Sequence, residues 1–169
     1  CFYELAYIDL GFVLCRFLGN RTKVGPLANS ARTLPRPFMR SMKVLILEDN
    51  PFQLMVLHQM LNAFRIFDVL AAESVESARC SLAKCEGIDL AICDLHLEGL
   101  SGIELIRELA TKREAQALII LSCAAPHVVE SAVRTAREEG LEVLGYLPKP
   151  VTVNGLGRLL DAYGTRAGA

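Results

Sequence analysis

The sequence contains no hydrophobic run long enough to cross a membrane. A spanning helix needs roughly 18 consecutive apolar residues, and the longest candidate, residues 2–18, is interrupted by Glu4, Asp9 and Arg16. We therefore expect a soluble protein that has no membrane partner.

Cysteine pairs with the spacing of a metal or redox motif are also missing. The six cysteines stand at positions 1, 15, 80, 85, 93 and 123, and none of them forms a C-x-x-C pair. Two of them lie in apolar, strand-like runs, where cysteine behaves as a small hydrophobic residue. A disulfide framework and a zinc site are therefore disfavoured, and a reducing, cytoplasmic location fits the pattern.

Basic residues are not in excess in the main part of the chain. The net charge of the 169 residues is −1, but residues 1–41 carry six basic and two acidic side chains, whereas residues 42–169 carry twelve and seventeen. A general nucleic-acid surface needs clustered Lys and Arg, so we expect no nucleic-acid partner. Hydrophobic residues make up 52% of the chain, which excludes a disordered chain and favours one domain with an appendage.

Residues 1–41 differ in character from the rest. They begin with Cys, lack a regular hydrophobic period and end in a stretch rich in helix breakers, whereas Met39 or Met42 would be a natural start. We interpret residues 1–41 as an N-terminal extension that is disordered or an artefact of the reading frame, with a basic targeting arm as the alternative. Residues 42–164 are the expected domain and residues 165–169 a short tail.

From Met42 onward, short apolar runs alternate with helical stretches, which is typical of βα units in a parallel sheet. The five runs are residues 43–47, 67–71, 89–93, 117–122 and 142–147. The second run is shorter and more broken, as an edge strand can be. Right-handed crossovers favour a doubly wound α/β fold with helices on both faces, in which ligands bind at the carboxyl ends of the strands.

The stretches between these runs have helical spacing of their apolar residues. In the first stretch, one buried stripe is predicted at Phe52, Val56, Gln59 or Met60, and Ala63. Asn50, which stands before a proline, predicts the start of that helix.

Three acidic residues follow strands. Glu48 and Asp49 come directly after the first run, and Asp94 comes directly after the third. If these strands are neighbours, the carboxylates converge in one crevice. Crowded carboxylates raise a pKa or recruit a cation, and an all-oxygen site of this kind suits Mg²⁺. The alternative for each acid is that it caps a helix or faces water.

Two further polar residues are expected at the same edge of the sheet. Ser122 closes the fourth run and Lys149 follows the fifth. A hydroxyl and an ammonium can hold the oxygens of a phosphoryl group that is transferred to a metal-bound carboxylate. Pro148 and Pro150 restrict the backbone around Lys149, and a cis bond before Pro150 is left open.

Four segments together resemble the receiver domain of two-component response regulators. They are LILEDN (45–50), AICDLHLEGLSGIEL (91–105), LIILSCA around Ser122 and GYLPKP (145–150), and the resemblance covers roughly residues 42–164. It implies a five-stranded, CheY-like sheet of the flavodoxin type with strand order 2-1-3-4-5.

The resemblance also implies a role for each acidic residue. Asp94 would be the phosphoacceptor that takes a phosphoryl group from the phosphohistidine of a kinase. Asp49 and Asp94 would bind Mg²⁺ directly, Glu48 would act through water, and the backbone carbonyl of His96 would complete the protein ligands. The side chain of His96 would then be a candidate modulator of how fast water removes the phosphoryl group.

Three more residues would form the switch that the resemblance implies. Ser122 would turn toward the phosphoryl group, Lys149 would contact it, and Tyr146 would be the aromatic residue that follows Ser122 inward. The fourth helix, the fifth strand and the last helix of the domain would transmit this change to another protein.

The leading hypothesis is a phosphorylation-activated signalling switch that is not itself an enzyme. It would accept its phosphoryl group from a sensor histidine kinase or a phosphotransfer protein and would act on a downstream protein. Whether the phosphorylated form dimerises is left open. The segments LEDNPFQ and GLEVLGYLPKPVTVNGL also resemble receivers that precede a cyclic-di-GMP phosphodiesterase module, so a longer regulator is the alternative.

Three other functions are disfavoured by the same residues. An aspartate-nucleophile phosphatase would need a second aspartate where His96 stands and a cap segment that the chain has no room for. A flavodoxin-like cofactor binder needs a phosphate loop after the first strand, where Glu48 and Asp49 would repel the ligand. A phosphorylation-independent adaptor would not need the complete acidic set.

Overall fold

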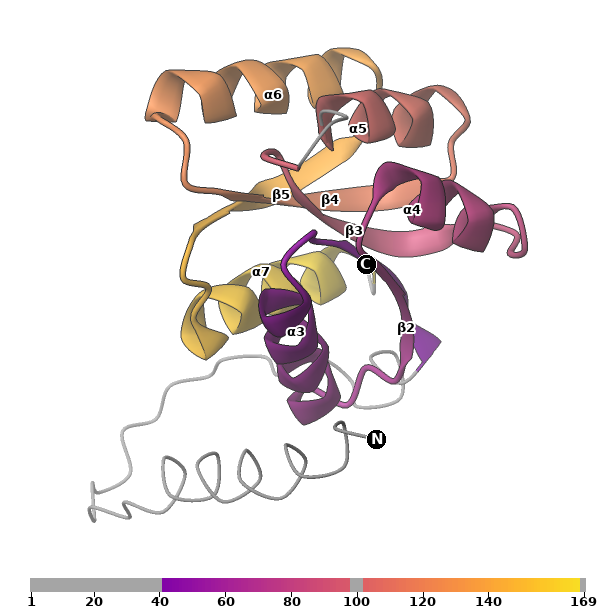
Figure 1. Ribbon diagram of the computed structural model, residues 1–169, viewed down its shortest axis with the longest axis vertical. Coiled ribbons are helices and arrows are strands. Elements are labelled where there is room, and N and C mark those ends of the chain that lie inside the picture. The colour runs from indigo at the N-terminus through magenta and orange to yellow at the C-terminus, as the bar shows by residue number, and fades with distance from the viewer. Residues whose placement is uncertain (1–40, 98–101, 168–169) are drawn as a thin grey trace. The chain divides into compact units, whose positions relative to one another are not determined.

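The computed structural model describes residues 41–97 and 102–167, so the extension predicted at residues 1–41 lies outside the described residues except for Ser41. Strands and helices alternate along the described chain (Figure 1). The strands are β1 (Lys43–Leu47), β2 (Asp68–Ala72), β3 (Ile88–Asp94), β4 (Ala115–Ser122) and β5 (Glu142–Pro148). The helices are α3 (Pro51–Ala63), α4 (Val75–Leu82), α5 (Gly102–Thr111), α6 (Pro126–Glu138) and α7 (Val153–Ala167).

The five strands form one parallel sheet in the order β2-β1-β3-β4-β5. This order confirms the doubly wound fold class and places β2 at an edge, as predicted. It also makes β1 and β3 neighbours, with Leu47 beside Cys93. The residues that follow these two strands therefore meet at the carboxyl edge of the sheet.

Helices cover both faces of the sheet, and each face has its own hydrophobic core (Figure 1). The core between the sheet and α4, α5 and α6 contains Leu45, Leu118 and Ile120. The core on the opposite face, under α3 and α7, contains Ile46 and Ile119. The central strands are thus buried on both sides, which explains why their sequences are almost continuously apolar.

Helix α3 buries a different stripe from the one predicted. Asn50 does cap the helix, since its side chain accepts hydrogen bonds from the backbone N–H groups of Phe52 and Gln53. The buried residues, however, are Leu54, Leu57 and Leu61, whereas Phe52 is 62% exposed. The prediction was wrong because two apolar stripes share the helix, and the leucines at i, i+3 and i+7 are the stripe that packs.

Strand β5 contains a register shift that no sequence pattern indicated. Leu118 pairs with Val143 and Ile119 pairs with Gly145, so Leu144 is an extra residue on β5. Leu144 packs against the core under α7, and a side chain at Gly145 would meet Leu159 of α7 on that same face. Two successive residues therefore face α7, and the alternation of β5 is reset after them.

The last helix extends beyond the predicted end of the domain. Residue 164 was the expected boundary, but α7 continues to Ala167. Gly157 allows α7 to approach α3 closely, because a Cβ there would come within 2.9 Å of the Phe64 ring. None of the helices in residues 41–97 and 102–167 combines the length and the apolar character that crossing a bilayer demands.

Candidate functional site

The three acidic residues expected at the sheet edge do come together. Glu48, Asp49 and Asp94 each offer a carboxylate oxygen, and these oxygens lie within 4.8 Å of one another. Glu48 is 0% exposed and Asp94 is 2% exposed, whereas Asp49 is half-buried. This acidic cluster is therefore open to solvent mainly at Asp49.

Backbone hydrogen bonds hold two of these carboxylates in place. The N–H of Asn50 donates to Oε1 of Glu48 at 3.3 Å, and the N–H of His96 donates to Oδ1 of Asp94 at 3.0 Å. The strand ends are themselves tied to neighbouring strands, because Glu48 N donates to Ala72 O at 3.0 Å. The cluster is thus built on rigid elements of the sheet, not on a free loop.

Lys149 joins the two buried carboxylates. Its Nζ lies 2.5 Å from Oδ2 of Asp94 and 2.6 Å from Oε2 of Glu48. The contact with Asp94 is a hydrogen bond, whereas Oε2 of Glu48 is held by charge and proximity without hydrogen-bond geometry. The sequence predicted that Lys149 lies at this edge of the sheet, but it did not predict these two contacts. The peptide bond between Lys149 and Pro150 is cis.

Burial and charge shift two pKa values in this pair. Burial raises the pKa of the Glu48 carboxyl, and the nearby charge of Asp94 adds to this, although Lys149 opposes both. Burial by itself would lower the pKa of the Lys149 ammonium, but Asp94 and Glu48 outweigh it and the pKa is raised. The proton therefore stays on Lys149, which is a cation at neutral pH.

Two further residues at this edge were predicted from the sequence. Ser122 ends β4 and is 4% exposed, and its Oγ accepts a hydrogen bond from Ala124 N at 2.8 Å. Its carbonyl oxygen accepts from Lys149 N at 3.3 Å, which links the ends of β4 and β5. The side chain of His96 is exposed, and the role predicted for its backbone carbonyl stays a prediction.

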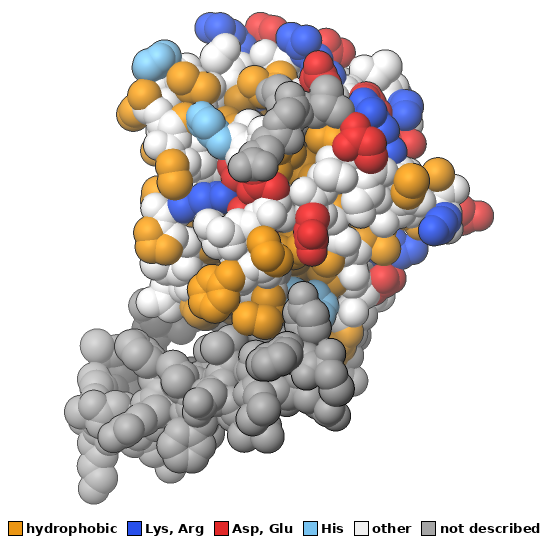
Figure 2. All heavy atoms as spheres, viewed as in Figure 1, with side chains coloured by type: hydrophobic (Ala, Val, Ile, Leu, Met, Phe, Trp, Pro, Cys, Tyr) orange, Lys and Arg blue, Asp and Glu red, His pale blue; other side chains and the backbone are white. Residues whose placement is uncertain are grey.

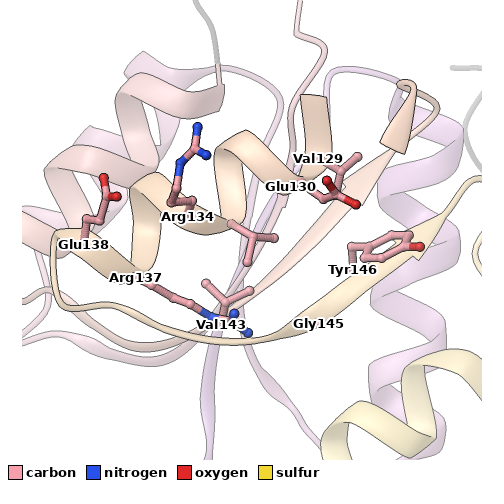
Figure 3. Close-up of a pocket in the computed structure, with 9 residues that line it drawn as sticks. Val129, Glu130, Arg134, Arg137, Glu138, Val143, Gly145 and Tyr146 are labelled. Atoms are coloured by element: carbon pink, nitrogen blue, oxygen red, sulfur yellow. The ribbon is translucent and has the colours of Figure 1, made fainter. Parts of the chain in front are cut away.

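Tyr146 lies outside the acidic cluster, on β5, with 56% of its surface exposed. It lines a groove of about 460 Å³ between α6 and β5, together with Val129 and Glu130. Figure 3 shows its ring beside the strand at one end of this groove, whereas Arg137 lies at the other end. An exposed aromatic ring at this position can change its rotamer without disturbing a core.

A second groove, also of about 460 Å³, adjoins the acidic cluster, and no sequence pattern indicated it. Phe52, Val56, Cys123 and Val151 line it, and Lys149 forms one wall. It arises because the unburied stripe of α3 faces the loops after β4 and β5. In Figure 2, hydrophobic side chains lie to the left of and below the acidic and basic side chains in the middle of the visible face.

The oxygen atoms of the acidic cluster suit a small divalent cation. Carboxylate oxygens are the ligands that Mg²⁺ prefers, and this ion keeps several waters in a partly open site. Lys149 supplies one positive charge against the two carboxylates that it touches, so this group keeps a net negative charge. The residues present therefore fit the predicted metal.

Comparison with known proteins gives matches over the same residues. Residues 44–161 match the family model described as the response regulator receiver domain. The chain is 30% identical over 128 residues to the cyclic di-GMP phosphodiesterase RocR of Pseudomonas aeruginosa, covering 76% of this chain and 33% of RocR. The chain spans a third or less of the length of the curated relatives that it matches.

Solved structures show the same architecture. A response regulator from Colwellia psychrerythraea superposes with a TM-score of 0.62 at 28% identity, covering 74% of this chain and 98% of that one. A response regulator protein from Burkholderia pseudomallei gives a TM-score of 0.59 at 25% identity, covering 76% of this chain and 71% of that one. The latter structure contains a phosphorylated aspartic acid, a calcium ion and citrate.

Proposed function

The chain belongs to the family of response regulator receiver domains of two-component systems, and from this membership we propose that Asp94 accepts a phosphoryl group from a histidine kinase or a phosphotransfer protein. The observation that carries the proposal is the position of Asp94. It is almost fully buried at the end of β3, within 4.8 Å of two other carboxylates and 2.5 Å from the ammonium of Lys149. The phosphorylated aspartic acid of the Burkholderia relative supports this assignment.

The transfer is a substitution at phosphorus. A carboxylate oxygen of Asp94 attacks the phosphorus of a phosphohistidine and forms a P–O bond, while the P–N bond breaks and its electron pair returns to the imidazole, which takes up a proton. There is little covalent chemistry for the protein to do, so positioning and electrostatics carry the rate. The ammonium of Lys149 would neutralise charge on the oxygens of the transferred phosphoryl group.

Mg²⁺ is the cofactor that this site would hold. Asp49 and Asp94 would bind it directly, Glu48 would act through water, and the backbone carbonyl of His96 would be the remaining protein ligand. When bound, the ion neutralises negative charge on the phosphoryl oxygens during the transfer. Burial raises the pKa of Glu48, so protons compete for this carboxylate at a higher pH than they do for an exposed one.

The phosphorylated state would be read on the face of the domain formed by α6, β5 and α7. Ser122 would turn toward the phosphoryl group, Lys149 would bind it, and Tyr146 would follow Ser122 inward from its exposed position. The β5 register shift supports this relay, because Tyr146 pairs with Ile120, whose side chain is on the α6 side of the sheet. A downstream protein would then recognise the altered groove between α6 and β5.

The test is a phosphorylation assay with a small phosphodonor such as acetyl phosphate in the presence of Mg²⁺. The wild-type protein should take up one acid-labile phosphoryl group, and Asp94→Asn should take up none. Asp161→Asn is the matched control, because it makes the same change on an exposed position of α7, and it should behave like the wild type. Labelling that persists in Asp94→Asn would refute the assignment.

A second proposal concerns the output of the signal. The similarity to RocR, of which this chain covers a third, supports a receiver that controls a cyclic-di-GMP phosphodiesterase module. We place this regulator in the cytoplasm, because the exposed thiols of Cys80 and Cys123 persist in a reducing compartment. The experiment is to measure cyclic-di-GMP hydrolysis by the complete gene product with and without phosphodonor. Hydrolysis that does not depend on phosphodonor, or no hydrolysis, would contradict the proposal.

A further inference from the structure

Gly102, the first residue of α5, lies directly against the backbone of Asp94. A Cβ built on Gly102 would overlap the carbonyl oxygen of Asp94 and would approach the Asp94 carbonyl carbon to 3.1 Å and the Cα of Leu95 to 3.3 Å. The φ angle of Gly102 is outside the left-handed region. Glycine is therefore required here by lack of space and not by backbone conformation.

This contact differs from those of the other described glycines. A Cβ at Gly145, Gly155 or Gly157 would meet mainly side-chain atoms, which can rotate away, and at Gly140 it would meet nothing within 4 Å. Compared with Gly87, Gly140, Gly145, Gly155 and Gly157, Gly102 alone would bring a Cβ within 3.0 Å of backbone atoms. A methyl group there would have to move a helix or a strand end.

Neither partner of this contact moves easily. Helix α5 is anchored by Leu105, Ile106 and Leu109, which are 1%, 1% and 0% exposed. The other side is anchored as well, since Leu95 N donates to Leu121 O of β4 at 3.2 Å. A close-packed interior transmits such strain instead of absorbing it, and the peptide between Asp94 and Leu95 carries the carbonyl that a methyl group at Gly102 would overlap.

The backbone that follows this peptide contacts the Asp94 carboxylate. The next N–H along the chain, that of His96, donates to Oδ1 of Asp94 at 3.0 Å. A tilt of the Asp94–Leu95 peptide would displace this N–H and with it the carboxylate. We propose that Gly102 is a positioning residue. Its missing side chain lets α5 approach the Asp94 backbone closely, and this approach sets the orientation of the phosphoaccepting carboxylate of Asp94.

This inference rests on the proposed function and deepens it. Displacing a reactive group by about 1 Å can lower a rate by roughly 10²-fold. For Gly102→Ala we expect at least a tenfold loss in the rate of phosphoryl uptake at saturating Mg²⁺ and a weaker affinity for Mg²⁺. The substitution improves helix propensity, so a defect in the site would not come from weakening the helix itself.

The test compares the wild type with Gly102→Ala and Gly157→Ala. Gly157 is a matched control because it is also a buried glycine in a helix. A Cβ built on Gly157 would meet the side chain of Phe64, which is far from Asp94 along the chain. Urea unfolding and circular dichroism define conditions in which all three proteins are folded. Acetyl phosphate uptake, Mg²⁺ titration by calorimetry and the amide resonance of His96 are then measured.

The expected result is a slow rate, weak Mg²⁺ binding and a shifted His96 amide resonance in Gly102→Ala alone. Uptake and a His96 resonance equal to those of the wild type would overturn the inference. If the wild type itself takes up no phosphoryl group, the proposed function fails. The His96 resonance of metal-free Gly102→Ala still decides the positioning role in that case, because a general structural role would not move it selectively.

A second measurement covers the case in which Gly102→Ala does not fold. Wild-type protein is titrated with beryllofluoride and Mg²⁺, which together mimic a phosphorylated aspartate. Because Gly102 lies against the Asp94 carbonyl, we expect this titration to shift the NMR resonances of Gly102 as much as those of Leu95. Unchanged Gly102 resonances beside a shifted Leu95, or no response at either residue, would contradict the inference.

Discussion

Replacing Lys149 with methionine should make the folded state depend on a metal ion. Lys149 touches Glu48 and Asp94 through the same nitrogen, and its side chain is only 11% exposed. Methionine keeps most of the volume but removes the charge. Two buried carboxylates then lose their cation, and removing one partner of a buried ion pair is strongly destabilising.

The loss of unfolding free energy in Lys149→Met can be estimated in two ways. Breaking a buried pair costs about 3–5 kcal/mol. The alternative for the protein is to protonate Glu48, which at pH 7 and from an ordinary pKa of 4.5 costs about 3.4 kcal/mol. We therefore expect Lys149→Met to lose about 3 kcal/mol of unfolding free energy at pH 7 without metal, roughly a 150-fold change in the folded-to-unfolded ratio.

The sign of the pH dependence follows from the raised pKa of Glu48. A carboxyl whose pKa is higher in the folded state stabilises that state at low pH, and this contribution is lost as pH rises through the folded-state pKa. Without Lys149 the pKa of Glu48 rises further. The difference from wild type should therefore shrink as pH falls from 7 toward 5, and saturating Mg²⁺ should also shrink it, because the ion replaces the missing charge.

Urea unfolding with EDTA and with Mg²⁺, at pH 7 and pH 5, tests this reasoning. Lys112→Met is the control, since its side chain is 55% exposed and its ion pair within residues 41–97 and 102–167 is with Glu108 at 3.6 Å, and it should change stability by less than about 0.5 kcal/mol. The reasoning is refuted if Lys149→Met in EDTA at pH 7 is as stable as the wild type, or if its loss does not respond to Mg²⁺.

Three other residues, Gly140, Tyr163 and Cys93, lead to predictions that simple measurements can test. Gly140 has a φ of +89° and open space around it, so Gly140→Ala should cost about 1 kcal/mol in urea unfolding through backbone strain alone. Tyr163→Phe removes the hydrogen bond to Gln116 and should cost about 1 kcal/mol. In the wild type, burial raises the pKa of Tyr163 to about 12, and ultraviolet titration should show this late ionisation. Burial raises the pKa of Cys93 to about 12, so mass spectrometry after iodoacetamide should find it unmodified while the exposed Cys123 reacts.

Much of the fold could be predicted because its signals are local. The run at residues 43–47 has the bounds of β1, and the broken second run is the edge strand β2. Hydrophobic periodicity marks a strand or a helix without reference to the rest of the chain. The same method was wrong for α3, since two apolar stripes compete there and only the neighbouring strands decide which one is buried.

The residues of the candidate site that directly follow a strand could be predicted from the sequence. Asp94 was expected after the third strand and is the last residue of β3. Because the carboxyl ends of parallel strands share one edge, such residues are expected to meet there once the strand order is known. Their roles in phosphoryl transfer stay predictions that the experiments above address.

The order of amino acids alone was sufficient for the alternation of strands and helices, for the class of fold and for the set of acids at one edge of the sheet. Three features appear only in the folded chain. They are the contact of Lys149 with Glu48, the exposed face that Tyr146 takes after the β5 register shift, and the close approach of Gly102 to the Asp94 backbone. The physical reason is that periodicity is a property of neighbouring residues. Contacts between distant segments depend instead on register and packing to within an ångström, which no short stretch of sequence encodes.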